Sequence, residues 1–115
     1  MNRRTFLAAS GALPAPTDGG TRLANKRAFI DAGPGTPDGL KVDVDGNLWV
    51  AWGMGGEGLD GVAVFSREGK LIGRIDLPAR CANLCFGGTY RNRLFMCGST
   101  AMYSLYVNTQ GAPGG

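Results

Sequence analysis

The sequence predicts an all-β protein made of short antiparallel strands. Three observations predict this class. The chain holds 20 glycines and 6 prolines among 115 residues, a content that disfavours long helices. Apolar and polar residues alternate with a period of two in several segments, as in half-buried strands. Turn-forming dipeptides such as Asp45-Gly46 and Glu68-Gly69 separate these segments.

The first predicted sheet is a meander in the middle of the chain. Residues 40–44 alternate, residues 48–52 are continuously apolar, and Asp45-Gly46 between them favours a two-residue hairpin turn. A glycine-rich loop then leads to another apolar run and a second hairpin, and Pro78 ends the pattern. The predicted strands are residues 40–44, 48–52, 61–65 and 71–77.

The same order of strands then begins again. Residues 82–86, 94–97 and 102–107 repeat the pattern, with Leu84 lying 44 residues after Leu40. A four-stranded unit at this spacing is typical of a β-propeller blade, about 40–50 residues long. The apolar run 28–30 would supply the outer edge of a preceding blade. We therefore expect a fragment of a propeller with about one and two-thirds four-stranded antiparallel blades.

The N-terminus is predicted to be a targeting segment rather than part of the folded domain. Arg3 and Arg4 precede an apolar stretch, residues 6–13, which resembles a twin-arginine export signal. The alternative is a basic N-terminus that leads into a short helix. Residues 14–21 have linker composition. We expect an export-signal-like segment and linker over 1–21 and a partial propeller over 22–115. We also expect a periplasmic or secreted protein. No clean cleavage site follows the apolar stretch.

Composition excludes several kinds of chemistry within this sequence. It has no histidine, so it supplies neither a Ser-His-Asp or Cys-His nucleophile nor a His-ligated zinc site. The net charge of +3 comes from scattered basic residues, which does not favour nucleic acid as a partner. No apolar stretch of about 18 residues is present, so we expect no membrane-spanning helix.

Two motifs carry a resemblance to a known family. Residues 36–51, Thr-Pro-Asp-Gly-Leu-Lys-Val-Asp-Val-Asp-Gly-Asn-Leu-Trp-Val-Ala, resemble the gluconolactonase/regucalcin-like (senescence-marker-protein) family. Residues 81–88, Cys-Ala-Asn-Leu-Cys-Phe-Gly-Gly, resemble the next blade of its bacterial members. The resemblance implies the C-terminal blades of a six-bladed β-propeller, a divalent metal, usually calcium, at one end of the central channel, and hydrolysis of sugar lactones.

Asp38 is the candidate metal ligand and catalytic residue. The resemblance implies that the Asp of Pro37-Asp38-Gly39 enters the channel and binds the metal, and that this or a neighbouring carboxylate takes a proton from the attacking water. Without the resemblance, Pro-Asp-Gly is most often a turn sequence. The family's other principal ligands, a Glu and an Asn, belong to blades outside this sequence.

Asn83 is the candidate substrate-binding residue. It occupies the repeat position of Gly39 at the start of a predicted strand. It would face the channel and support a ligand or a substrate hydroxyl, or it would satisfy backbone groups at the strand start. The sequence leaves these two roles open.

Two glycine-containing motifs are assigned structural roles. Residues 43–47 resemble a calcium loop, but the twelfth position from Asp43 is Met54 where an EF-hand needs Glu, so a hairpin turn explains them better. Residues 53–58 match G-x-G-x-x-G, but another strand follows where a dinucleotide fold needs a helix.

The three cysteines are expected to be buried free thiols. Cys85 lies four positions after Cys81, about 13 Å along a straight strand, too far for a disulfide. Cys85 and Cys97 would be able to face each other across a hairpin.

The resulting hypothesis is metal-dependent hydrolysis of a sugar lactone. The alternative is a non-catalytic propeller fragment, or an interaction module that packs with other chains. Strand edges left without neighbouring blades would favour self-association.

Overall fold

The computed structural model describes residues 5–8, 26–53 and 58–114. Within these residues all regular structure is β, and every strand pair is antiparallel, which confirms the predicted fold class. No helix in the described part of the chain is long and apolar enough to cross a membrane. Contacts divide the chain into two units, residues 1–34 and 35–115.

The first unit contains a two-stranded ribbon. Strand β1, Thr5–Ala8, pairs with β2, Arg27–Asp31, and Thr5 lies opposite Asp31. The expected strand at 28–30 is therefore present. Its partner comes from the segment assigned to an export signal, and that backbone is extended where the alternative expected a short helix. Arg3, Arg4 and the predicted linker lie outside the described residues.

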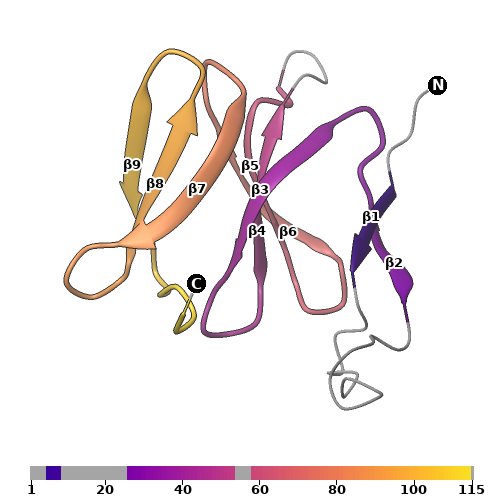
Figure 1. The fold of residues 1–115 in the computed structure, drawn as a ribbon, viewed down its shortest axis with the longest axis horizontal. Coiled ribbons are helices and arrows are strands. Elements are labelled where there is room, and N and C mark those ends of the chain that lie inside the picture. The colour runs from indigo at the N-terminus through magenta and orange to yellow at the C-terminus, as the bar shows by residue number, and fades with distance from the viewer. Residues whose placement is uncertain (1–4, 9–25, 54–57, 115) are drawn as a thin grey trace. The chain divides into compact units, whose positions relative to one another are not determined.

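The second unit opens with the predicted four-stranded meander (Figure 1). Its strands follow one another in chain order: β3 Thr36–Val42, β4 Leu48–Gly53, β5 Gly61–Phe65 and β6 Leu71–Asp76. Strand β5 has the predicted bounds. Strand β3 begins four residues earlier than predicted, because the Pro-Asp-Gly segment is part of the strand and not a turn before it.

A three-stranded sheet follows in the same unit. Its strands are β7 Cys81–Gly87, β8 Arg93–Gly98 and β9 Met102–Tyr106, again in chain order. This arrangement confirms the predicted repeat. In each sheet the first strand is the one nearest the other sheet, since β7 contacts both β3 and β4 (Figure 1).

The two strand connections that contain Asp45-Gly46 and Glu68-Gly69 share one turn geometry. The amide of Asp43 donates to Asn47 O (3.0 Å), and Gly46 N donates to Asp43 O (3.0 Å). Ser66, Gly69 and Lys70 make the equivalent bonds. Gly46 and Gly69 have φ of 85° and 84°, which favours glycine. The loop thus has three residues and a glycine bulge, so the two-residue turn expected at Asp45-Gly46 was wrong.

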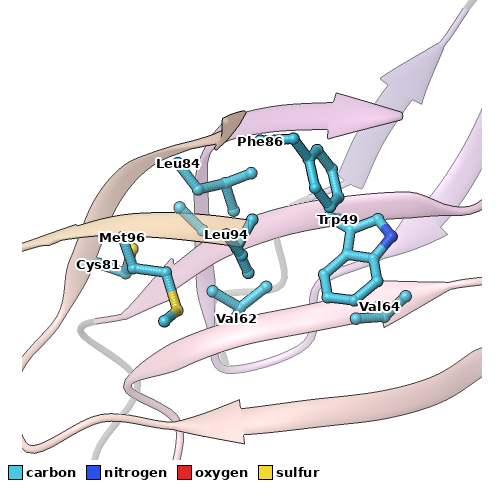
Figure 2. Close-up of a cluster of buried hydrophobic side chains, with 9 residues drawn as sticks. Trp49, Val62, Val64, Cys81, Leu84, Phe86, Leu94 and Met96 are labelled. Atoms are coloured by element: carbon cyan, nitrogen blue, oxygen red, sulfur yellow. The ribbon is translucent and has the colours of Figure 1, made fainter. Parts of the chain in front are cut away.

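The core of the second unit lies between its two sheets. Apolar side chains that alternate along β4 and β5 pack on those of β7 and β8 (Figure 2). The cluster consists of Trp49, Ala51, Val62, Val64, Cys81, Leu84, Phe86, Leu94 and Met96. Trp49 meets Phe86 edge to face, with ring centroids 5.4 Å apart. Burial of one face of each sheet against the other is the driving force that fixes this pair of sheets.

The segment after β9 ties the two sheets together. Gln110 O accepts a hydrogen bond from Val44 N, and Ala112 N donates to Val42 O, both at 2.9 Å. On the other side, Arg91 Nη2 donates to Ala112 O at 2.7 Å. We call residues 107–112 the strap. It joins the hairpin of the first sheet to the hairpin at residues 88–92 of the second.

Candidate functional site

Asp38 lies in a β-bulge at one end of β3. Pro37 pairs with Trp52 and Leu40 with Val50. An advance of three residues along β3 therefore matches an advance of two residues along β4, so β3 holds one extra residue. Pro37 has no amide hydrogen to give to a ladder, and bulges are among the few places where a sheet tolerates proline. A bulge bends the strand and redirects its side chains. The Asp38 side chain is 48% exposed and accessible to a ligand.

Strand β7 has a matching bulge beside it. Cys81 pairs with Gly98 and Asn83 with Cys97, so one extra residue is accommodated in β7. The two bulges meet: a Cβ added to Gly39 would collide with the Asn83 side chain and would lie 3.0 Å from Asn83 Cα. The structure therefore packs the two bulges that hold the sequence-predicted site residues against each other, with Gly39, the neighbour of Asp38, in contact with Asn83.

Asn83 fulfils the backbone role, one of the two roles that the sequence left open, while its amide nitrogen stays available. Its Oδ1 accepts a hydrogen bond from Leu84 N at 2.9 Å, which is the backbone role. Its side chain is exposed, and Nδ2 has no hydrogen-bond partner among the described residues. This amide group is therefore able to donate to a substrate oxygen.

Arg80 is a site residue that sequence reasoning missed. Its Nη2 lies 3.3 Å from Asp38 Oδ2, and the two side chains are 42% and 48% exposed. The pair links the residue just before β7 to the bulge of β3. The only sequence signal was a basic residue placed directly before a first strand of the repeat, and the pairing itself depends on how the two sheets pack.

Asp43 has a structural role. It is 2% exposed, and its carboxylate accepts hydrogen bonds from four groups: the amides of Asp45 and Asn47, Asn47 Nδ2 and Trp49 Nε1, at 2.9–3.1 Å. Burial raises the pKa of this carboxyl, but the hydrogen bonds from Trp49, Asn47 and Asp45 outweigh burial and hold the pKa below its usual value. The predicted hairpin, rather than a calcium loop, is confirmed.

The three cysteines have unequal environments. All are free; Cys81 is buried, whereas Cys85 and Cys97 are exposed. The prediction of buried thiols thus holds for Cys81 and is wrong for the other two, because their side chains lie on the face of the sheet opposite the core. Cys85 pairs with Phe95 and Cys97 with Asn83, so the two are diagonal neighbours and do not lie directly opposite each other. Burial raises the pKa of the Cys81 thiol.

The chemical type of the oxygen donors at the two bulges suits a hard cation. Asp38 offers a carboxylate and Asn83 an amide, and Asp60 Oδ1 would lie 3.2 Å from a Cβ on neighbouring Gly53. Calcium prefers such ligands but takes about 6–8 of them. No group of three His, Cys, Asp or Glu residues able to hold a metal occurs in the described part of the chain. The described residues would supply only part of a ligand set, and residues 54–57 of the glycine loop lie outside them.

Comparison with known proteins places this geometry in a family. Residues 14–100 match the SMP-30/gluconolactonase/LRE-like region. The chain belongs to this family. The match covers both bulges, and the resemblance expected from residues 36–51 and 81–88 is confirmed.

Three relatives illustrate the match. The chain is 35% identical to regucalcin of Danio rerio over 64% of its own length and 25% of the relative. It is 34% identical to pentonolactonase XacC of Haloferax volcanii over 70% of its length and 23% of the relative. The solved structure of XC5397, a gluconolactonase from Xanthomonas campestris, superposes with a TM-score of 0.58 at 31% identity, covering 74% of this chain and 26% of that one.

The chain spans about a quarter of the length of these relatives. The aligned part is long enough to include two sheets of the repeated fold.

Proposed function

We propose that this chain provides the Asp38 end of a lactone-hydrolysing site. The observation that carries the proposal is the meeting of two β-bulges, which packs Gly39, the neighbour of the exposed carboxylate Asp38, against the exposed residue Asn83. Family membership supports sugar lactones as the substrate class, since relatives include a pentonolactonase and a gluconolactonase.

The reaction adds water to the lactone carbonyl carbon and breaks the ring C–O bond, and the product is a hydroxy acid. A bound divalent cation, with calcium as our proposal, would polarise that carbonyl. Asp38 would hold such a cation through its carboxylate, and this or a neighbouring carboxylate would accept the proton of the attacking water. Asn83 Nδ2 would donate to a sugar hydroxyl and orient the ring. The remaining oxygen ligands would come from water or from other segments of polypeptide.

The test is lactone hydrolysis by the full chain, followed as acid release from glucono- and pentonolactones with calcium and with a chelator. Asp38→Asn removes the charge without changing the size of the side chain. Asp76→Asn is the matched control, because Asp76 lies on the same sheet with its side chain 75% exposed. We expect Asp38→Asn to abolish calcium-dependent hydrolysis and Asp76→Asn to retain it. Equal activity in both variants would contradict the role of Asp38.

A second candidate function is association with other chains. The face of the β7–β9 sheet that is turned away from the core exposes apolar side chains: Met102 is 68% and Tyr106 69% exposed. Cys85 and Cys97 are exposed on the same face. We propose that a second copy of the chain covers this face. Sedimentation at increasing concentration, with Met102→Lys as the disrupting variant, would show a dimer that the variant lacks; a monomer at all concentrations would contradict the proposal.

We also propose that the chain is exported. The paired arginines of residues 3 and 4 support export to the periplasm or medium. Replacing both by Lys should retain the chain in the cytoplasm of a bacterial host, as fractionation would show; export of this variant would contradict the twin-arginine route.

A further inference from the structure

Arg80 is anchored between the two sheets by the absence of a side chain at Gly53. A Cβ on Gly53 would collide with Arg80 Cβ and would lie 3.0 Å from Arg80 Cα. Gly53 is the last residue of β4, so the end of the first sheet leaves room for the stem of Arg80. This packing fixes the start of the side chain and lets the guanidinium reach across to Asp38.

The contact at the far end of the side chain is weak by comparison. The structure shows one contact between Nη2 and Oδ2, at 3.3 Å, which is longer than the 2.7–2.9 Å typical of a charge-assisted hydrogen bond. Both side chains are more than two-fifths exposed, so solvent screens the pair. Such a pair is formed and broken at little cost.

We propose that Arg80 is the resident counter-ion of Asp38, and that a metal cation and the guanidinium compete for the same carboxylate. This inference rests on the cation-binding role of Asp38 under the proposed function. Arg80 therefore lowers the cation affinity of the site, because a cation has to displace the guanidinium and then bind beside its positive charge. Removal of that charge should tighten cation binding.

The size of the effect follows from the exposure of the pair. Unit charges about 4 Å apart in a water-like medium interact by roughly the energy of a fivefold change in affinity, and a multivalent cation interacts more strongly. Salt screens part of this interaction. We expect about a three- to tenfold decrease in the dissociation constant when the charge of Arg80 is removed.

The experiment is a titration of the full chain with Tb³⁺, a hard cation whose luminescence tryptophan sensitises, followed by displacement with Ca²⁺. Trp52 pairs with Pro37, next to Asp38, and is suitably placed as donor. The variants are Arg80→Gln and Arg80→Met, which remove the charge, and Arg80→Lys, which keeps it. Arg74→Gln is the matched control, because Arg74 forms a comparable pair with an exposed aspartate, at 3.9 Å. Circular dichroism confirms that each variant is folded.

We expect both neutral variants to bind Tb³⁺ about three- to tenfold more tightly, and Arg80→Lys and Arg74→Gln to match the natural chain. Unchanged or weaker binding in both neutral variants, while Asp38→Asn still abolishes the signal, would overturn the competition and leave the proposed function intact. A signal that is unaffected by Asp38→Asn, or no signal in any variant, would overturn the cation role of Asp38 and this inference with it.

Discussion

The contact between the two bulges makes Gly39→Ala the most informative single substitution. The added methyl group would collide with the side chain of Asn83 and would lie 3.0 Å from its Cα, where ordinary contacts are 3.4–4 Å. Rotation of Asn83 would relieve only the first collision. The second requires β7 to move relative to β3, and this strand pair carries the candidate site.

The expected cost follows from overpacking. Extra methyl groups in tightly packed positions typically destabilise a protein by about 1–3 kcal/mol. Gly73→Ala is the matched control, because Gly73 is also a strand glycine without positive φ, and nothing lies within 4 Å of its added Cβ. There the loss of chain entropy in the unfolded state should stabilise by about 0.4–1 kcal/mol. The two variants should thus change stability in opposite directions.

Urea unfolding followed by tryptophan fluorescence measures both changes. Asn83→Ala in the Gly39→Ala background removes the colliding side chain and should recover at least about 0.5 kcal/mol relative to the sum of the single changes. Gly39→Ala should also weaken lactone hydrolysis by shifting Asn83. The packing of the two bulges would be refuted by a Gly39→Ala chain as stable as Gly73→Ala, or by the absence of any recovery in the double variant.

Three further predictions concern Asp43, the thiols and the strap. The pKa of Asp43 is lowered in the folded protein, so its stabilising contribution is complete above its unfolded pKa of about 3.8 and is lost as pH falls through its folded pKa. In urea titrations, Asp43→Asn should therefore be less stable than the natural chain at pH 7. The variant should also lose less stability than the natural chain below pH 4. A thiol reagent should modify exposed Cys85 and Cys97 rapidly and buried Cys81 only on unfolding; three equal rates would be inconsistent with the register. Arg91→Ala removes the 2.7 Å bond to the strap and should cost about 1–2 kcal/mol by thermal denaturation, whereas an unchanged Tm would show that the strap does not hold the sheets together.

The sheets were largely predictable because their signals are local. Alternating or continuous apolar runs identified β3 to β9 to within a few residues, since one buried face imposes a period of two on a strand and two buried faces impose an unbroken apolar run. The two hairpin glycines were equally visible, and their positive φ explains why glycine occupies these positions. The N-terminal ribbon was missed for the same reason: β1 has four residues, and an apolar run after two arginines fits an export signal as well as a strand.

The candidate site was predictable only in part. Asp38 and Asn83 were named from a motif and from a repeat position, and neither signal indicated that the segments holding them pack together. This packing depends on two bulges, each of which shifts a register by one residue through pairing with another strand. Arg80 and its carboxylate partner are 42 residues apart in sequence, and no local pattern connects them.

The sequence by itself determined the all-β class, the order of strands within each sheet, the hairpin role of Asp43 and the family to which the chain belongs. These properties follow from the spacing of apolar residues and from short turn motifs, in which each residue acts on its near neighbours. Tertiary structure alone decided which side chains share a site and which are exposed. Packing of one sheet on the other buried Cys81, left Cys85 and Cys97 on the opposite face, and brought Arg80 to Asp38. Such contacts join residues far apart in the chain, and only the burial of apolar surface between two complete sheets creates them.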